Sequence, residues 1–343
     1  MSEGKKKIHI GFITYGKSTA KYLPYFLPSL KAQGYGSLEI MAVDNSEAGE
    51  DENEKFICEK YPEIKFSRAE KNLGFAKAYN RMINEAMQKG AEYFIAVNPD
   101  MIFQPDFISR LVEAIEADKD AGAAAPKILK WDFKNNKETN LIDSYGLYIT
   151  KEHRFSDSRQ GEIDEQGTGQ AKEVFGFNGA AVIFRLEALR DTAFDNGRYL
   201  EFFDELMFMY KEDCDLSYRL RLAGWKIIFD PKAVAYHDRT ASPKGESNLM
   251  IAKNRKNKSP QVKKWSFLNQ WIIILKYSRL PFSFSIRLAT AIYQAKSLAF
   301  AAIFEPYLLK EFITLWKIWN KVSKRREQLK LRISVGKIEM LME

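Results

Sequence analysis

Polar side chains stand where an apolar run of this sequence stops. Residues 94–97 are apolar and β-prone, and Asn98, Pro99 and Asp100 follow them. Asn and Asp are poor strand formers, and proline removes a ladder donor. Amide and carboxylate oxygens accept hydrogen bonds from N–H and hydroxyl groups, so these residues suit recognition of a polar ligand. The pattern indicates a binding site at the end of a buried strand.

A second acidic group, Glu212 and Asp213, lies far along the chain in the stretch KEDCDLSYR. Adjacent carboxylates repel each other, which costs free energy. Such a pair therefore suggests a functional role. The structural alternative is an acidic helix N-terminus, where Asp favours the helix dipole. We expect that structural role for Asp215. Arg219 and Arg221 follow on the same expected helix. One of them could pair with a phosphate or an acceptor anion, but we expect them to be helix surface charges.

Strand-like and helix-like runs alternate through the first part of the chain, and these elements must position the polar residues. Strands are expected at residues 8–15, 37–46, 64–70 and 91–100, and helices at 19–33, 54–61, 74–90 and 105–118. This alternation predicts an α/β fold with a mostly parallel sheet. In open α/β sheets, ligands bind outside the carboxyl ends of the strands. Polar residues gather just there: Thr14, Tyr15, Asp44, Asn45, Asn72, Asn98 and Asp100.

The rest of the first part is less regular. We expect strands and mobile loops at residues 127–175, and then a strand and a helix start at 174–189. A loop, a helix ended by Gly224 and a strand reaching His237 should follow. The Lys-, Asn-, Ser- and Pro-rich residues 241–262 are typical of a linker or mobile loop. The predicted organisation is an α/β domain at 1–240, this linker, and a basic amphipathic helical region at 263–343.

Composition narrows the protein class. The 343 residues are 45% hydrophobic and 29% charged, which is ordinary for a folded domain. The two cysteines, Cys58 and Cys214, are far apart, which argues against a disulfide framework or a zinc site and fits a reducing compartment. The N-terminus does not have a signal-peptide pattern, and no apolar run is long enough for a spanning helix.

The net charge of +8 is unevenly distributed. Residues 251–343 hold 19 Lys and Arg against 5 Asp and Glu, so the remainder of the chain is mildly acidic. The asymmetry predicts two parts with different partners.

Seven segments resemble, in order, the family 2 glycosyltransferases, particularly the bacterial rhamnosyltransferase-like branch. They span about residues 8 to 240 and are FITYGKSTAKYLPYFLPSLKAQ, EIMAVDNSEAGE, NLGFAKAYNRMINEA, AVNPDMIFQPDFI, FNGAAVIFR, YKEDCDLSYRLRLAGWKI and PKAVAYH. The resemblance implies a GT-A fold, which is a Rossmann-like, nucleotide-diphospho-sugar-binding α/β domain. It also implies sugar transfer with inversion, usually with a divalent metal.

The resemblance also implies roles on the donor side. Asp44 would read the base or ribose, with Thr14 and Tyr15 nearby. Asn98-Pro99-Asp100 stands where the family has its D-x-D, and Asp100 would ligate Mg²⁺ or Mn²⁺. Asn98 departs from that pattern, which weakens the metal assignment. Asn72 and Gly74 open a helix whose N-terminus would face the nucleotide.

The remaining implied roles concern the reaction. Asp213 resembles the general base that takes the acceptor proton, with Glu212 orienting the acceptor. The structural alternative for His237 is an ordinary packed histidine, and the family resemblance implies that it completes the metal site. Asn178 and Gly179 would line the acceptor or sugar pocket, although a tight turn before a buried strand explains them equally well.

The expected donor is a UDP- or dTDP-sugar, with dTDP-rhamnose as the first choice, and the acceptor a cell-envelope glycan or lipid-linked sugar. A nucleotidyltransferase is an alternative, but it would have a Gly-rich basic phosphate loop, whereas TYGKSTAKYLP has one Gly. A catalytically silent nucleotide-sugar-binding module is the other alternative, which the departure at Asn98 keeps open.

The C-terminal region mixes aromatic, apolar and basic residues. Trp265, Trp271, Trp316 and Trp319 alternate with Lys and Arg, as in interfacial helices. We expect peripheral binding to an anionic membrane at the cytoplasmic face of a bacterial cell. The alternative is a helical subdomain packed on the catalytic domain or in an oligomer interface. Without a recognised nucleic-acid-binding motif, no nucleic acid partner is expected.

Overall fold

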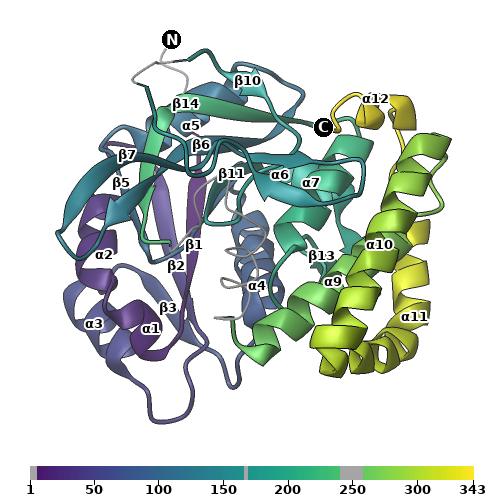
Figure 1. Cartoon of the computed structure of the whole chain (residues 1–343). Coiled ribbons are helices and arrows are strands. Elements are labelled where there is room, and N and C mark those ends of the chain that lie inside the picture. The colour runs from purple at the N-terminus through teal and green to yellow at the C-terminus, as the bar shows by residue number, and fades with distance from the viewer. Residues whose placement is uncertain (1–5, 166–168, 240–257) are drawn as a thin grey trace.

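A ten-stranded mixed sheet forms the centre of the protein (Figure 1). The structure is a computed structural model, and it describes residues 6–165, 169–239 and 258–343. The strand order is β10-β14-β6-β11-β4-β1-β2-β3, with β5 beside β14 and β7 beside β6. The predicted α/β architecture is thus present, and the sheet extends well beyond the first hundred residues.

One half of the sheet is parallel. It consists of β1 (Ile8–Thr14), β2 (Leu38–Asp44), β3 (Lys65–Arg68) and β4 (Tyr93–Val97). The sequences of β1, β2 and β4 are mostly apolar, which is typical of strands covered on both faces, whereas β3 stands at the edge of the sheet. The register places Thr14 directly beside Asp44, so the polar ends of these strands meet at one edge.

The other half is mixed and is assembled from distant segments. β11 (Ala181–Arg185) runs antiparallel between β4 and β6 (Ala121–Asp132), and β14 (Lys226–His237) runs parallel to β6. β14 also pairs with β5 (Met101–Phe103), with His237 opposite Met101. This pairing brings His237 next to Asp100, although 136 residues separate them in the sequence.

The region 127–175 holds much of the remaining strand structure. After the end of β6 come β7 (Lys137–Ser144), β8 (Leu147–Ile149), β9 (Phe155–Asp157) and β10 (Lys172–Glu173). β8 and β9 form a separate antiparallel pair.

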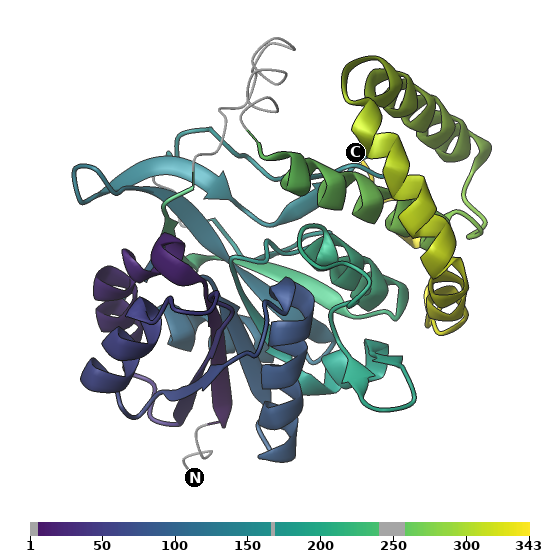
Figure 2. The same cartoon turned by 90° about the horizontal axis from the view of Figure 1, so that it is seen from below.

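Helices cover both faces of the sheet, as Figure 2 shows. One core contains side chains of α2 (Leu23–Lys31), α3 (Glu52–Lys60) and α5 (Phe107–Glu116). The other contains side chains of α4 (Gly74–Gln88), α6 (Leu186–Thr192) and α7 (Glu212–Leu222). The single helix expected at 19–33 is divided into α1 (Gly16–Ala20) and α2, because Pro24 stands in the first turn of a new helix.

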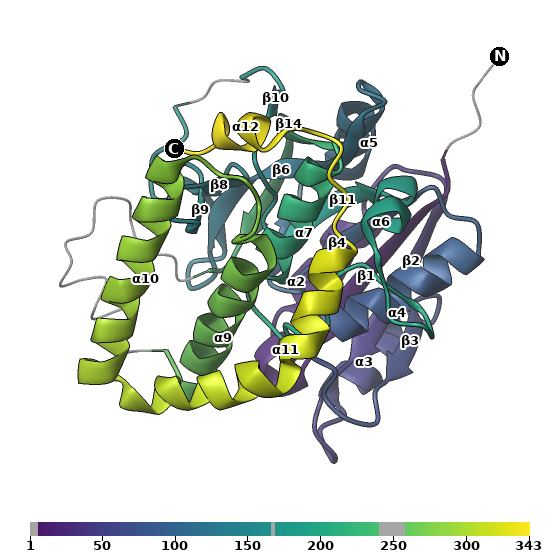
Figure 3. The same ribbon diagram turned by 90° about the vertical axis from the view of Figure 1, so that its right-hand side faces the viewer.

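The C-terminal region is a group of helices on one side of the sheet (Figure 3). They are α9 (Pro260–Tyr277), α10 (Phe284–Phe304), the 3₁₀ helix η1 (Pro306–Lys310), α11 (Glu311–Glu327) and α12 (Val335–Glu339). α9 begins inside the range predicted as a linker, and residues 241–257 of that range lie outside the described residues. Among the helices that the structure describes, none has the length and apolar character needed to cross a membrane.

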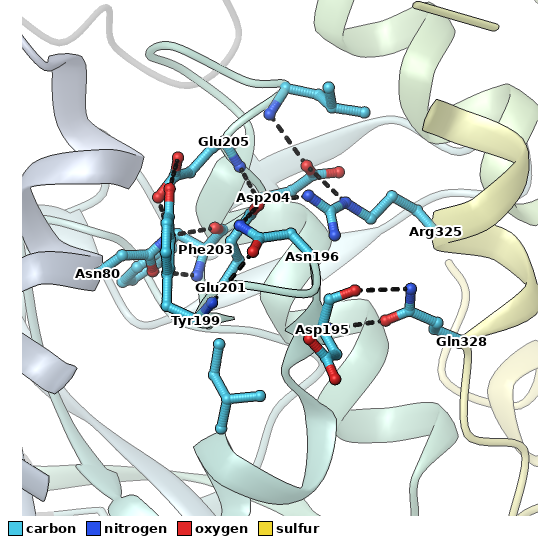
Figure 4. Close-up of polar contacts among 12 residues, drawn as sticks. Asn80, Asp195, Asn196, Tyr199, Glu201, Phe203, Asp204, Glu205, Arg325 and Gln328 are labelled. Atoms are coloured by element: carbon cyan, nitrogen blue, oxygen red, sulfur yellow. Dashed lines mark hydrogen bonds and ion pairs between the residues drawn. The ribbon is translucent and has the colours of Figure 1, made fainter. Parts of the chain in front are cut away.

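α9 and α11 pack against α7 and the segments that precede it. The rings of Tyr277 in α9 and Tyr218 in α7 stack with centroids 4.0 Å apart. Figure 4 shows the segment at residues 195–205 between α4 and α11, where Asn80 donates to the carbonyl of Phe203 and Arg325 pairs with Glu201. These helices therefore share a core with α7.

Arg219 and Arg221 are buried, which corrects the expectation that they are helix surface charges. The guanidinium of Arg219 lies 3.0 Å from Asp215 and also donates to the carbonyl of Thr192. Arg221 forms an ion pair with Glu173. The expectation failed because α6, α9 and β10 pack around α7, and the helix sequence alone does not reveal these neighbours.

Candidate active site

The carboxylate of Asp44 lies fully buried at the end of β2. Its Oδ1 accepts from the hydroxyls of Thr14 (2.7 Å) and Ser46 (2.6 Å), and Ser46 in turn accepts from the backbone N–H of Gly16. Within the described residues Oδ2 accepts no hydrogen bond, and the guanidinium of Arg68 is 3.8 Å away. A buried acceptor without a donor suits an N–H or hydroxyl group of a ligand.

The loop before α4 is tied to its neighbours by side-chain amides. Asn72 accepts from the N–H of Gly74 (2.8 Å), while Asn45 accepts from Leu73 and donates to the carbonyl of Gly74. Gly74 has φ +71°, and a Cβ there would collide with the carbonyl oxygen of Phe208. Only glycine fits this close approach, which joins the loop to the segment that precedes α7.

Tyr15 and Asn98 lie at the carboxyl ends of the neighbouring strands β1 and β4. Tyr15 is 40% exposed, and its hydroxyl lies 3.3 Å from Glu47. Asn98 is half-buried, and its backbone N–H donates to the carbonyl of Ala180. The strand order therefore brings both predicted residues to the same edge as Asp44.

Asp100, His237 and Asp143 form a chain of contacts. His237 Nε2 lies 3.2 Å from Asp100 Oδ2, and Nδ1 lies 2.8 Å from Asp143 Oδ2. Burial would lower the pKa of His237, but the two carboxylates outweigh it and raise that pKa to about 9. Burial would raise the pKa of Asp100, yet His237 lowers it overall. Asp143 fixes the ring so that Nε2 faces Asp100.

Arg239 continues this chain beyond His237. Its guanidinium lies 3.9 Å from Asp143 and 2.9 Å from Asp157 in β9. The other oxygen of Asp157 accepts from the side-chain amide of Asn178 at 2.6 Å. Asn178 lies in the turn that precedes β11, and the ion pair between Arg239 and Asp157 orients its side chain.

Asp213 lies in the first turn of α7 and contacts Gly179, which follows Asn178 in the turn before β11. Its Oδ2 accepts from the N–H of Gly179 at 3.2 Å, and its Oδ1 accepts from the N–H of Cys214. Burial raises the pKa of Asp213. Burial, and then the charge of Asp213, raises the pKa of Glu212 well above its usual value. Carboxyls with raised pKa values are suited to accept protons near neutral pH.

Three residues of this network escaped the sequence reasoning: Asp143, Asp157 and Arg239. The first two lie in the region 127–175, where no motif marks them. Arg239 directly follows His237-Asp238, and its proximity to that motif was the one available signal. The neighbouring Asp238 accepts from the hydroxyl of Tyr22 at 2.6 Å, and its backbone N–H donates to the carbonyl of Asp100.

The residues around Asp100 fit a divalent cation that is shared with a ligand. Within the described residues no group of three or more His, Cys, Asp and Glu side chains is arranged to hold a metal ion. Asp100 and His237 supply one carboxylate and one imidazole, and Asp143 holds the imidazole in place. Mg²⁺ is commonly bound by one or two carboxylates together with substrate phosphates. The pair therefore suits a metal that a diphosphate helps to bind.

Residues 10–185 match the family model described as Glycosyl transferase family 2. The match covers more than half of the chain, and the chain belongs to this family. It is therefore a glycosyltransferase, as the sequence predicted, and an inverting reaction is consistent with this family.

A curated relative lies within the branch that the sequence resembled. It is an N-acetylglucosaminyl-diphospho-decaprenol L-rhamnosyltransferase of Mycobacterium tuberculosis, which matches equally in two strains. The two proteins are 24% identical over 262 residues, which cover 71% of this chain and 80% of the relative. The rhamnosyltransferase-like resemblance is confirmed.

Solved structures support the fold. GalNAc-T7, crystallised with UDP, GalNAc and Mn²⁺, aligns with a TM-score of 0.55 at 14% identity over 90% of this chain and 58% of that one. S. aureus TarS 1-349 aligns with a TM-score of 0.53 at 14% identity over 98% and 83% of the two chains. The predicted GT-A-like α/β fold is confirmed.

Proposed function

We propose that this glycosyltransferase moves a hexose, with rhamnose as the first choice, from a dTDP- or UDP-sugar to an acceptor hydroxyl with inversion. One observation carries the proposal: a continuous line of side-chain contacts connects the candidate metal pair to the candidate base. It runs through Asp100, His237, Asp143, Arg239, Asp157 and Asn178, and adjacent Gly179 bonds Asp213.

The donor nucleotide would lie along the carboxyl ends of β1, β2 and β4. The Oδ2 of Asp44, which accepts no hydrogen bond within the described residues, is suited to an N–H of the base or a ribose hydroxyl. Tyr15, Asn72, Gly74 and Asn98 lie in the loops that border this edge. This position is the one where open α/β sheets bind nucleotides.

Asp100 and His237 would hold Mg²⁺ or Mn²⁺. Such an ion, when bound, stabilises the negative charge that develops on the departing nucleoside diphosphate. With a pKa of about 9, His237 is protonated near neutral pH, so it would have to release its Nε2 proton to take this role. Asp143 would accept the hydrogen bond from its Nδ1–H. The presence of Mn²⁺ in the GalNAc-T7 structure supports a metal of this kind.

Asp213 would act as the general base. The acceptor hydroxyl loses its proton to the Asp213 carboxylate while its oxygen forms a bond to the anomeric carbon. The bond between that carbon and the phosphate oxygen breaks, and the nucleoside diphosphate leaves with the electron pair. Attack from the opposite face inverts the anomeric carbon, and the raised pKa of Asp213 makes it a stronger base. Glu212 would orient the acceptor.

The acceptor is a lipid-linked or cell-envelope glycan in this proposal. The M. tuberculosis relative acts, by its name, on N-acetylglucosaminyl-diphospho-decaprenol. An acceptor of that class carries a sugar hydroxyl on a membrane-embedded lipid. Asn178 and Gly179, beside Asp213, would line its sugar pocket.

A membrane-bound acceptor agrees with exposed apolar residues on the outer helices. Ile303, Phe304 and Trp316 are 70%, 67% and 78% exposed. Exposed lysines, Lys317 and Lys321 among them, accompany the tryptophan on α11. Aromatic and apolar side chains with nearby lysines are typical of surfaces that bind anionic membranes. We include peripheral binding at the cytoplasmic face of the membrane in the proposed function.

Calorimetric titration with UDP and dTDP, each with and without Mn²⁺, tests the donor site. Metal-dependent binding of one nucleotide would identify the base of the donor. Incubation with dTDP-rhamnose and a lipid-linked N-acetylglucosamine acceptor then tests transfer. Binding without release of nucleoside diphosphate would point to the silent module. Transfer of the nucleotidyl group, with release of rhamnose 1-phosphate, would point to a nucleotidyltransferase.

A further inference from the structure

The segment directly before α7 has an unusual backbone. Tyr210 and Lys211 have φ +72° and +68°, and neither is a glycine. In this left-handed region the Cβ of an L-residue crowds the following carbonyl oxygen, so surrounding contacts must hold the conformation. The next two residues are Glu212 and Asp213. The conformation of this turn therefore sets the direction in which the first turn of α7 presents its carboxylates.

Two side chains on one face of α9 hold this turn. Asn269 is buried, and its Nδ2 donates to the carbonyls of Met209 (2.9 Å) and Tyr210 (2.7 Å). Trp265, one helical turn earlier, stacks on Phe208 with ring centroids 4.9 Å apart. Residues four apart lie on the same face of a helix, so α9 contacts the segment at two successive points.

The same segment also contacts the donor side of the site. The carbonyl of Phe208 accepts from the N–H of Phe75 at 2.9 Å, and it is the group that excludes a Cβ at Gly74. Residues 208–211 thus lie between the donor loop and the base. From α9, Trp265 and Asn269 contact this segment.

We propose that Asn269 is a positioning residue for the catalytic base, acting through the left-handed turn at Tyr210 and Lys211. The inference rests on the proposed role of Asp213. Both amide hydrogens of Asn269 are used on carbonyls of the turn, so a residue without donors leaves two carbonyls without these bonds. The turn then relaxes toward negative φ, and the hydrogen bond between Gly179 and Asp213 is lost.

The test is Asn269→Ala, with Gln270→Ala as the matched control. Gln270 is the next residue of α9, and it also donates to a backbone carbonyl, that of His153. We expect kcat of N269A to fall about 10- to 100-fold, with the donor KM and nucleotide Kd within about twofold of wild type. Q270A should keep its kcat. A kcat of N269A within about twofold of wild type, or an equal loss in Q270A, would overturn the proposal.

A second variant separates positioning from general damage. Glycine adopts the left-handed conformation without the Cβ clash, so adding Lys211→Gly to N269A should restore part of the lost kcat. A double variant as slow as N269A would count against the mechanism. If N269A does not fold, Asn269→Ser keeps a single donor and should give a smaller loss of kcat; wild-type kcat in that variant would refute the proposal.

The proposed function has its own controls in the same experiment. If the wild-type protein does not transfer sugar from dTDP- or UDP-sugars, the proposed function fails before Asn269 is tested. If D213N remains active, the base assignment fails. An active wild type, an inactive D213N and a fully active N269A would reject the inference about Asn269 alone.

Discussion

The backbone N–H of Gly179 and the carboxylate of Asp213 are joined by a hydrogen bond of 3.2 Å. It connects the turn before β11 to the first turn of α7, two segments that are 34 residues apart in sequence. A Cβ at Gly179 would lie in ordinary contact, 3.4 Å from the Cβ of Asp213. The bond fixes one oxygen of the Asp213 carboxylate. It also holds this carboxylate close to Asn178, where the acceptor is expected.

Asp213→Asn should nearly abolish transfer and leave nucleotide binding intact. The amide has the shape of the carboxylate but cannot accept the proton of the acceptor. We expect kcat to fall by about 10³-fold, within the range known for general bases. Initial rates and nucleotide titration measure the two effects. Asp118→Asn is the control, since Asp118 forms an ion pair with Lys226 away from the candidate site. A D213N enzyme with substantial activity would refute the assignment.

The rate of transfer should fall at acid pH because Asp213 must be ionised. Burial raises its pKa above the ordinary 3.8, so the acidic limb of kcat/KM should lie above that pH. A profile between about pH 4 and pH 9 would show it. An acidic limb at or below the pKa of an exposed aspartate would contradict the prediction.

The contribution of the Glu212 and Asp213 carboxyls to the free energy of unfolding should fall as pH rises, whereas the rate of transfer should rise. Glu212 and Asp213 both have raised pKa values in the folded state, so this state binds more protons than the unfolded chain above the ordinary carboxyl pKa. Their contribution is therefore present at low pH and is lost as pH rises through the folded pKa values. The double variant E212Q/D213N should lose this dependence in denaturant unfolding, whereas a curve that matches wild type at every pH would contradict it.

Asp100→Ala and His237→Ala should each weaken metal-dependent nucleotide binding. Removal of either partner takes away one of two proposed ligands, and we expect the affinity measured with Mn²⁺ to fall by about 100-fold. Affinity without metal should change much less. Titration with and without Mn²⁺ measures both values. Equal nucleotide affinity in wild type and D100A with Mn²⁺ would refute the metal role of Asp100.

Gly74→Ala should disturb the donor loop, and Gly90→Ala provides a matched control. Both glycines have φ +71° at the ends of α4, but a Cβ at Gly90 meets nothing within 4 Å. G90A should cost about 1 kcal/mol in the free energy of unfolding, which reflects the backbone conformation alone. G74A should cost more and weaken nucleotide binding, because the new Cβ strikes the Phe208 carbonyl. Identical effects of the two substitutions would show that this contact is unimportant.

Membrane binding is best tested by surface substitutions on α10 and α11. Deletion of residues 263–343 would remove α9, whose side chains share a core with α7, and so would disrupt the fold as well. The triple variant I303S/F304S/W316S should bind vesicles containing phosphatidylglycerol at least about tenfold more weakly. Ile163→Ser, at another exposed apolar residue, is the control. Unchanged vesicle binding of the triple variant would refute the role of these helices.

Local sequence patterns were enough to predict the alternating strands and helices and the polar residues that end them. Thr14, Asp44, Asn98 and Asp100 could be placed at one edge because parallel strands bring their carboxyl ends together. These signals are local, since residue periodicity and strand-ending residues are visible in short windows. Family resemblance, also carried by short motifs, indicated Asp213 and His237.

The residues from distant segments that complete the candidate site become visible only in the folded chain. Asp143 and Asp157 reach the site through β7 and β9, and Asn269 reaches the turn before α7 from a helix that the sequence suggested would lie on a membrane. The burial of Arg219 depended on the same packing. Each depends on pairing between segments far apart in the chain, and such pairing is set by the shared core and not by any local pattern.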